Sequence, residues 1–508
     1  MMGPAQRSVP RLFYTQFNLE ERIRPDHPLR AIRGAVDFDF VRRVVKPLYG
    51  QRGNRSVDPA VLLKLMFLLF YEQVPSERAL MARMPERLDW LWFCGFDLDS
   101  ELPDHSVLSK ARRRWGRKAF EEFFVRILAQ CIEAELVDGG LEHADSSLIR
   151  ANADQEKLRV ALRLAGGRLY ERLEETAGAD GVSPGPAEPG AEEDEAGGEG
   201  EEGGPGPVAP GTLVSPTDPE ARLTRKSGRS VLGYKDHRVV DDRCGIITAT
   251  ITTDAAAADP HLLGELLDQH EANTGQPAET VVADMAYGTA DNYKDLASRG
   301  MTPCIAHQRR NNEVGDKFRR GQFVYDRASD TFRCPGGQVM HPGSRPASDG
   351  RWRYRAGRGV CAACPLRRQC TDNPNGRQVS RDVDQDVIDW ADTCLPGHRR
   401  RHLMRRRKIR AEGSFADATN RHGYKRARWR GLVRVTIQNL LIATIQNLRK
   451  LIRWNGRPGR SAARMARVGA VSGLAFHGSG WTSVVRWFRR FMTFLPAPAA
   501  LQPPAWRS

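Results

Sequence analysis

Residues 228–306 alternate segments typical of strands with segments typical of helices. The strand segments are short and rich in β-branched residues, and one of them ends directly in Asp284. The helix segments carry an aspartate N-cap before the first and a glycine after the second. This alternation predicts an α/β sheet covered by helices. We expect strands at 234–240, 245–252, 279–283 and 303–306, and helices at 260–273 and 291–299.

The first 135 residues carry helix signals instead. An aspartate–proline start signal precedes an apolar helix expected at 60–73. Another helix, expected at 106–115, ends with the consecutive residues Arg112, Arg113 and Arg114. A helical bundle that presents a basic helix suits DNA docking. An ordinary bundle with a solvated arginine face would give the same pattern.

Charge is distributed unevenly along the chain. The total is +16, but residues 171–209 hold twelve acidic side chains and one basic one, which leaves +27 on the rest. A chain this basic is expected to bind a polyanion, and nucleic acid is the first candidate. A basic surface that only prevents aggregation is the alternative. The Gly-, Pro- and Glu-rich block at 175–219 should be a disordered linker, because it buries too little apolar surface to fold.

We find no segment with the pattern of a signal peptide or a membrane anchor. The N-terminal residues lack an apolar core, and the most apolar stretch, at 61–71, is interrupted by Lys64 and too short to span a bilayer. The 508 residues, 40% of them hydrophobic, are enough for about three structural units with sizeable cores. We therefore expect a cytoplasmic, nucleoid-associated protein with no membrane partner.

Four of the nine cysteines form a cluster in the sequence. They are Cys334, Cys361, Cys364 and Cys370, and the C-x2-C pair with a further cysteine six residues later is close to the spacing of structural zinc sites. The surrounding segment is too polar to fold stably without a cross-link such as a bound metal ion. A tetrahedral Zn²⁺ held by four thiolates is our interpretation, with free thiols or a redox pair as the alternative.

Three acidic residues are candidates for metal-dependent phosphoryl transfer. Asp145 lies in a predicted strand, Asp284 ends another, and Glu412 lies on a helix rich in arginine and lysine. Strand ends in an α/β sheet bring together side chains from distant parts of a sequence. Two divalent cations about 3.5–4 Å apart can bridge a scissile phosphate when hard oxygen ligands hold them. An isolated aspartate is a weak signal, since most are caps, turns or surface groups.

Short motifs also follow one another in a specific order between about residue 15 and residue 453. Each is weak alone, but together they resemble the DDE transposases of bacterial insertion sequences, in the subgroup with a cysteine-bearing insertion between the second Asp and the Glu. The motifs are Arg55-Ser56-Val57-Asp58-Pro59, Ser76-Glu77-Arg78, Pro103-Asp104-His105-Ser106, Asp145-Ser146-Ser147, Ala151-Asn152-Ala153, Gly233-Tyr234-Lys235-Asp236-His237, Ala283-Asp284-Met285-Ala286-Tyr287-Gly288, Arg430-Gly431-Leu432 and Asn447-Leu448-Arg449-Lys450-Leu451.

The resemblance implies an α/β, ribonuclease-H-like catalytic domain with an all-α N-terminal domain and a small cysteine-rich, zinc-ribbon-like insertion. It implies that Asp145 and Asp284 are the two catalytic aspartates and that Glu412 completes the triad. These carboxylates would hold two Mg²⁺ (or Mn²⁺) ions for cleavage and strand transfer of double-stranded DNA. The partners would be the terminal inverted repeats and a target site, bound by a homodimer in the synaptic complex.

The family pattern around the glutamate is altered in this chain. It places a Tyr, an Arg and a Lys around the Glu, and counting from Glu412 finds Arg405, Lys408 and Thr419 there. Thr419 cannot supply a phosphate-binding cation, although Arg421 or Lys425 could substitute. Asp417 is the nearest rival carboxylate. The alternative function is therefore a catalytically impaired, transposase-derived DNA-binding protein, and a metal-dependent RNA nuclease is a more distant one.

The region around Glu412 is the most basic part of the chain. Residues 395–434 hold fourteen Lys or Arg and two acidic residues, which favours phosphate-backbone contact over a solvated helix face. We expect DNA contacts from Lys408, Arg405, Arg421 and Lys425, besides the three arginines at 112–114. The predicted layout begins with a helical N-terminal domain at 1–135. The catalytic domain follows in two parts, at 136–330 (interrupted by the linker at 175–219) and at 373–455, with a cysteine-rich insertion at 331–372 between them. A basic, partly disordered tail at 456–508 ends the chain.

Overall fold

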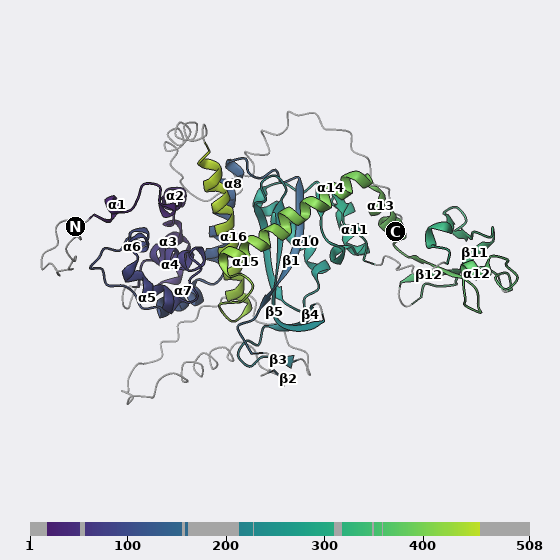
Figure 1. The fold of residues 1–508 in the computed structure, drawn as a ribbon, viewed down its shortest axis with the longest axis horizontal. Coiled ribbons are helices and arrows are strands. Elements are labelled where there is room, and N and C mark those ends of the chain that lie inside the picture. The colour runs from purple at the N-terminus through teal and green to yellow at the C-terminus, as the bar shows by residue number, and fades with distance from the viewer. Residues whose placement is uncertain are drawn as a thin grey trace, which may run out of the picture. The chain divides into compact units, whose positions relative to one another are not determined.

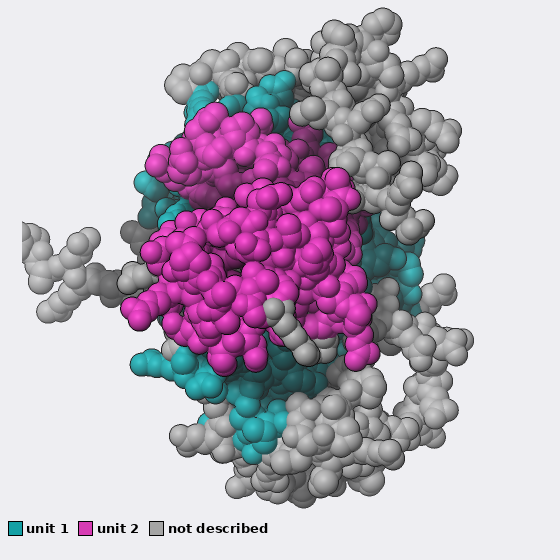
Figure 2. Space-filling model, turned by 90° about the vertical axis from the view of Figure 1, so that its right-hand side faces the viewer, with its two compact units in different colours: residues 1–258, 265–278, 408–498 teal, residues 259–264, 279–407, 499–508 magenta. Residues whose placement is uncertain are grey.

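The protein is a mixed α/β molecule in which two compact units can be distinguished (Figure 1). The computed structural model describes residues 18–50, 56–154, 158–160, 213–226, 228–308, 317–347, 350–357 and 359–457. Figure 2 colours unit 1 (residues 1–258, 265–278 and 408–498) teal and unit 2 (residues 259–264, 279–407 and 499–508) magenta. No helix within these described ranges is long and apolar enough to cross a membrane.

The predicted linker and tail lie largely outside the described residues, which omit 161–212 and everything after 457. The end of the predicted linker, however, is part of the described structure. Val214 lies in the short strand β3 (Leu213–Val214), and Asp218 is fully buried, where it accepts hydrogen bonds from Tyr234 Oη (2.5 Å) and the Gly431 amide (3.1 Å). The linker expected from composition therefore ends before residue 213.

The N-terminal part of unit 1 is helical, as predicted. Asp58 caps α4 by accepting a hydrogen bond from the Ala60 amide (3.0 Å), and Leu65 to Phe70 are fully buried because this helix is apolar on all sides. The helices are α1 (Leu19–Arg22), α2 (Pro28–Ala35), α3 (Phe40–Val45), α4 (Pro59–Tyr71), α5 (Glu77–Arg83), α6 (Leu88–Cys94), α7 (Ser106–Trp115) and α8 (Lys118–Glu133).

The sheet of unit 1 is antiparallel and is centred on its longest strand, β5 (Arg229–Asp241). One edge of β5 pairs with β1 (Leu141–Arg150). Its other edge pairs first with β4 (Arg222–Lys226) and then with β6 (Ile247–Asp254). β5 and β6 follow one another in the chain and are joined by a short turn, which is why local alternation and turn signals predicted this pair.

Helices α15 (Gly413–His422) and α16 (Leu432–Asn455) follow later in the chain and pack into unit 1 (Figure 1). α16 contacts α8, α4 and β6. Its Asn447 side chain accepts from the Ile247 amide (2.9 Å) and donates to the Ile247 carbonyl (2.8 Å), which fixes the helix to the start of β6. Helix α10 (Leu263–Thr274) contributes Asn273, which donates to the Thr248 carbonyl of β6 (2.8 Å).

Unit 2 contains a parallel strand pair with a connecting helix. β7 (Thr280–Val282) and β8 (Thr302–Cys304) are joined through α11 (Ala290–Ser298), which contacts α13 (Gln385–Thr393). Helix α14 (Gly397–Arg407) follows α13 along the chain. These elements agree with the strand and helix positions predicted between 279 and 306.

The cysteine-rich segment of unit 2 is built on a second, antiparallel sheet with its own small core. Phe332, Met340, Tyr354 and Val379 are all nearly inaccessible to solvent. The strands pair in chain order: β9 (Val324–Asp326), β10 (Thr331–Arg333), β11 (Val339–Pro342), β12 (Arg351–Arg355) and β13 (Gln378–Asp382).

Candidate nucleic-acid-processing site

Asp145 lies in the middle of β1 and is half-buried. Its Oδ1 accepts a hydrogen bond from the next amide, Ser146 N (2.9 Å). Its cross-strand neighbour on β5 is Arg238. Residues directly opposite each other in an antiparallel pair project from the same face of the sheet, so a fixed cation is built in beside this carboxylate.

Arg238 is completely buried and forms an ion pair with the equally buried Asp236 (Nε to Oδ2, 2.8 Å). Its Nη1 donates to Ser414 Oγ (3.0 Å) and to Gln446 Oε1 (2.9 Å), so it connects β5 with α15 and α16. Asp236 also accepts from Thr250 Oγ1 (2.7 Å) and from Tyr424 Oη (3.0 Å). Nearly every oxygen and nitrogen of the pair has a partner, which offsets much of the desolvation cost of two buried charges.

Glu412 ends a π-helical turn, η6 (Lys408–Glu412), and is exposed. This turn packs against both β1 and β5, and therefore lies beside the strand that carries Asp145. Ser414, two residues later, is held by Arg238. Unit 1 thus brings the segments of Asp145 and Glu412 together. Single π turns inside helices occur frequently at functional sites.

Lys425 is fixed to the end of β1. Its carbonyl accepts from the Arg150 amide (3.0 Å), and the Arg150 carbonyl accepts from the Ala427 amide (2.8 Å). The Lys425 ammonium donates to Ser147 Oγ (2.6 Å), two residues along β1 from Asp145. Burial of that ammonium against the sheet lowers the pKa of Lys425, and the carboxylates of Asp236 and Asp145 act in the opposite direction.

Thr419 occupies the position at which the family pattern has a lysine. Its hydroxyl donates to the Phe415 carbonyl one turn earlier (2.7 Å), so it is used within the helix. Arg421, the second substitute considered from the sequence, is exposed and pairs with Asp417 (3.1 Å). Of the two candidates, only Lys425 is placed beside the strand of Asp145.

Asp284 belongs to unit 2 and lies two residues after the end of β7. It is half-buried and caps the short turn η4 (Met285–Tyr287) by accepting from the Ala286 amide (2.9 Å). Gly288 ends the turn, and a Cβ there would lie 2.0 Å from the Ala306 carbonyl oxygen. The motif from Asp284 to Gly288 therefore requires glycine at its end.

The predicted basic contacts differ in exposure. Arg113, Arg114, Arg405 and Lys408 are exposed. Arg112 is buried: it pairs with Glu77 and stacks over the Trp429 ring at 3.9 Å. Arg112 therefore stabilises the packing of α7, and the predicted DNA contact is corrected for this residue.

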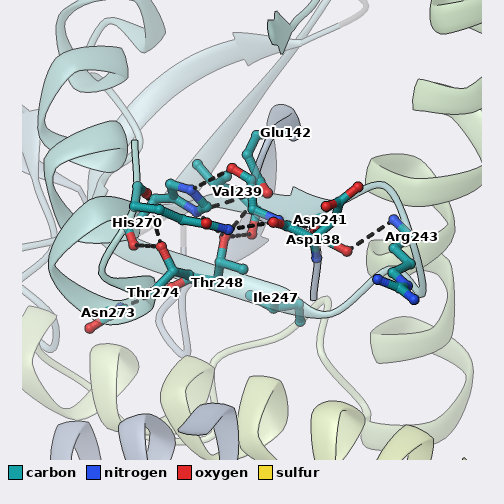
Figure 3. A network of polar contacts seen from close by, with 12 residues as sticks. Asp138, Glu142, Val239, Asp241, Arg243, Ile247, Thr248, His270, Asn273 and Thr274 are labelled. Carbon is teal, nitrogen blue, oxygen red and sulfur yellow. Dashed lines mark hydrogen bonds and ion pairs between the residues drawn. The ribbon is translucent and has the colours of Figure 1, made fainter. Parts of the chain in front are cut away.

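A second polar network lies beside the start of β1 (Figure 3). Glu142 is fully buried next to Asp241, and Thr248 Oγ1 donates to Glu142 Oε2 (3.2 Å). Burial raises the pKa of Glu142 well above its usual range, and the neighbouring Asp241 adds to this effect. His270 Nε2 lies 3.2 Å from the Gly139 carbonyl oxygen, and burial lowers the pKa of His270 to about 4. Burial therefore disfavours the charged forms of both Glu142 and His270 in this network.

The four clustered cysteines line one cavity in unit 2, together with Pro335, Gly336 and Arg367. Desolvation raises the pKa of Cys370, and the other three thiols add to this effect. A Cβ on Gly336 would lie 3.5 Å from Cys364 Sγ and 3.7 Å from Cys334 Sγ. The soft thiol donors suit Zn²⁺. In the part of the chain that the structure describes, however, no three Cys, His, Asp or Glu side chains form a ready metal site.

Arg238, Asp236 and Tyr424 are functional candidates that the sequence reasoning missed. Asp236 lies in the strand expected at 234–240 and in one of the family motifs, but no role was predicted for it, and Tyr424 lies in a basic segment that looks solvent-exposed in sequence. The available signal was the arginine at an inner position of a β-branched strand, because a charged residue there needs a buried partner.

Comparison with known proteins gives two family matches. Residues 17–114 match a family model described as a transposase domain (DUF772), and residues 333–452 match one described as a transposase DDE domain. No curated protein matches the sequence. One similar solved structure is the cryo-EM structure of a piggyBac transposase synaptic complex with hairpin DNA, at 9% identity over 90% of this chain and 87% of that one. Its TM-score of 0.24 is too low to support an argument.

Proposed function

Because the chain belongs to the DDE transposases of insertion sequences, we propose that it cuts double-stranded DNA at terminal inverted repeats and transfers the freed strand to a target site. One observation carries this proposal. Unit 1 packs the π turn of Glu412 against the strand of Asp145, and the Lys425 ammonium contacts Ser147 of that strand, two residues from Asp145. Phosphoryl transfer on DNA requires carboxylates with a cation close by.

The fold supports a ribonuclease-H-like catalytic domain. Unit 1 supplies the antiparallel strands β1, β5 and β6, and unit 2 supplies the parallel pair β7 and β8 with α11 between them. Asp145 lies on one of these strands, and Asp284 lies two residues after the end of another. In the proposed active site, Asp284 joins Asp145 and Glu412.

The proposed metal ligands are Asp145, Asp284 and Glu412, whose carboxylate oxygens suit Mg²⁺ or Mn²⁺. Two such ions would polarise the scissile phosphate and stabilise the leaving oxygen. Arg238 positions the acids: it lies opposite Asp145 on β5 and holds Ser414, two residues after Glu412. Lys425 would contact a non-bridging phosphate oxygen, with Ser147 orienting its ammonium.

DNA binding is proposed for the exposed cations Arg113, Arg114, Arg405, Lys408 and Lys425. Contacts of this kind fix the register of the duplex and make affinity strongly dependent on salt. Cleavage at two element ends would need two active sites, which supports a homodimer in the synaptic complex.

For the cysteine-rich segment we propose a structural Zn²⁺ bound by Cys334, Cys361, Cys364 and Cys370, because all four thiols line one cavity.

A catalytically impaired DNA-binding protein is the second candidate, and Thr419 is the observation that favours it. Its hydroxyl is already bonded within α15 and carries no charge. If Lys425 does not replace the missing cation, DNA binding would persist while strand cleavage would not.

Cleavage of labelled element-end DNA with Mg²⁺ tests the proposal. Wild-type protein should cut, whereas Asp284→Ala should bind the same DNA without cutting. An RNA duplex in competition separates a DNA enzyme from an RNA nuclease. Binding without cleavage by both proteins would favour the impaired alternative, and preferential cleavage of RNA would overturn the proposal.

A further inference from the structure

A basic groove lies on unit 1 where α15 and α16 meet the turn at Cys244 and Gly245. A second hollow adjoins it and reaches Tyr71 and the start of α2. The two hollows share Arg421, Arg449 and Arg453, so they form one continuous surface. The basic side chains that line this groove are Arg410, Arg421, Arg449, Lys450 and Arg453, and the only acidic one in either lining is Asp417.

The single carboxylate does not balance the groove. Asp417 is already engaged by Arg421 (3.1 Å) and by the Gln446 side-chain amide (2.9 Å). Arg410 donates to the Arg243 carbonyl (2.9 Å), and Arg449 stacks over the Tyr71 ring at 4.7 Å. The carbonyl oxygen and the aromatic ring are uncharged partners, so the positive charges of Arg410 and Arg449 are not neutralised. The groove therefore has a surplus of cations that an anion would relieve.

Lys450 also contributes to the excess of positive over negative charge in the groove. Its ammonium donates to the Gly245 carbonyl at the floor of the groove. Burial lowers its pKa to about 8, although Asp417 and the Cys131 thiol favour the charged form, while Arg410 and Arg238 oppose it. A bound anion would replace the hydration that this ammonium has lost.

The groove adjoins the π turn of Glu412, since Ile409, Arg410 and Gly413 line it, but Glu412 itself does not. Glu412 and Thr419 are seven residues apart, two turns, and so lie on one face of the helix. Arg421 is two residues further on, about 200° around the helix axis. Neither Asp145 nor Glu412 lines the groove.

We propose that this groove binds the phosphate backbone of double-stranded DNA at phosphates other than the scissile one. The proposal rests on the proposed function, which supplies the polyanion. The shared arginines Arg421 of α15 and Arg449 and Arg453 of α16 suit neighbouring phosphates, because guanidinium groups contact phosphate oxygens through paired N–H donors. Contacts of this kind hold the duplex in register and carry no sequence information.

The test uses the full chain and a mixed-sequence duplex DNA, since phosphate contacts do not depend on sequence. The variant is Arg449→Ala with Arg453→Ala, which removes one half-buried and one exposed arginine of α16 and leaves the three proposed catalytic carboxylates unchanged. Arg449→Lys with Arg453→Lys keeps the charges in place. Arg43→Ala with Lys46→Ala removes two charges from the exposed end of α3, outside the groove.

Affinity is measured against salt concentration. Each phosphate contact contributes about 0.9 to the slope of log K against log salt, so the alanine pair should make the slope shallower by about 1.8. We expect each lost charged contact to weaken binding roughly tenfold at low salt. The lysine pair should retain most of the affinity, and the α3 pair should change it no more than threefold.

An unchanged slope in the alanine pair, or an equal loss in the α3 pair, would overturn the groove proposal while wild-type cleavage of DNA left the proposed function intact. Failure of the wild-type chain to bind or cut DNA would overturn both. Tighter binding of an RNA duplex that is lost in the alanine pair would reassign the groove to RNA. Affinity of the groove for inorganic phosphate alone, with no effect of the variants on DNA, would also refute the DNA assignment.

Discussion

Replacing Arg238 with methionine would leave the Asp236 carboxylate buried without its counter-ion. Both side chains have no exposed surface, and the pair is 2.8 Å apart. Removing one partner of a buried ion pair typically costs about 3–5 kcal/mol. Asp236 would keep its hydrogen bonds from Thr250 Oγ1 and Tyr424 Oη, and methionine fills much of the arginine volume. We therefore expect a loss near the lower end, about 3 kcal/mol.

The assay is equilibrium unfolding in urea, with Arg225→Met at the exposed end of β4 as the matched control. That control should change the free energy of unfolding by less than about 0.5 kcal/mol. Asp236→Asn combined with Arg238→Met removes both charges and should recover part of the loss. A loss below about 1 kcal/mol for Arg238→Met, or no recovery in the double variant, would refute the reasoning.

Three further predictions follow from buried or clustered groups. The pKa of His270 is about 6.5 in the unfolded chain, and burial lowers it to about 4 in the folded protein. Its contribution to stability is therefore complete above pH 6.5 and falls, by up to about 3 kcal/mol, as the pH drops from 6.5 to 4. His270→Gln should flatten the fall in Tm on acidification, and an unchanged profile would contradict this. Cys364→Ser should lower both bound zinc, measured by elemental analysis, and Tm, whereas a zinc-free, equally stable wild type would exclude the site. Lys425→Ala should reduce the rate of DNA cleavage by about 10²-fold or more, as loss of a charge-stabilising donor does, with Lys425→Arg partly active; equal activity of the alanine variant would remove Lys425 from the mechanism.

Sequence patterns located most of the local structure of the catalytic region. The helix expected at 291–299 is α11 (Ala290–Ser298), and the strand expected at 279–283 contains β7 (Thr280–Val282). The helix expected at 260–273 begins with a 3₁₀ turn at Asp259–Leu262 before α10. These elements follow from periodicity, caps and β-branching, which act over a few residues.

The sequence did not reveal which arginines are structural. Arg112 lies in a run of three arginines that looks solvent-exposed, yet Leu108, Ala111 and Trp115 place it on the buried face of α7. A helical-wheel reading of those apolar neighbours would have separated Arg112 from Arg113 and Arg114. Because the three consecutive residues are all arginines, they were all predicted to be exposed.

The contacts of Lys425 and Arg238 depend on residues far away in the sequence. Lys425 meets Ser147, and Arg238 meets Ser414 and Gln446. No local rule of period or spacing encodes such contacts, because they arise only when α15 and α16 pack on the sheet. The identity of the family could be recognised from ordered motifs, and the sequence offered both Arg421 and Lys425 as substitutes for the lysine missing at Thr419. Only the tertiary structure distinguishes them, because Lys425 contacts Ser147 whereas Arg421 pairs with Asp417.

The π turn at Lys408–Glu412 has a consequence for how this chain can vary. Such a turn accommodates one residue more than an ordinary helical turn, and each residue of an α-helix advances about 100° around the axis. Losing a single amino acid here would restore regular winding and swing a different side chain into the place of Glu412. Homologues that are shorter by one position in this turn should therefore carry their acid at a neighbouring site.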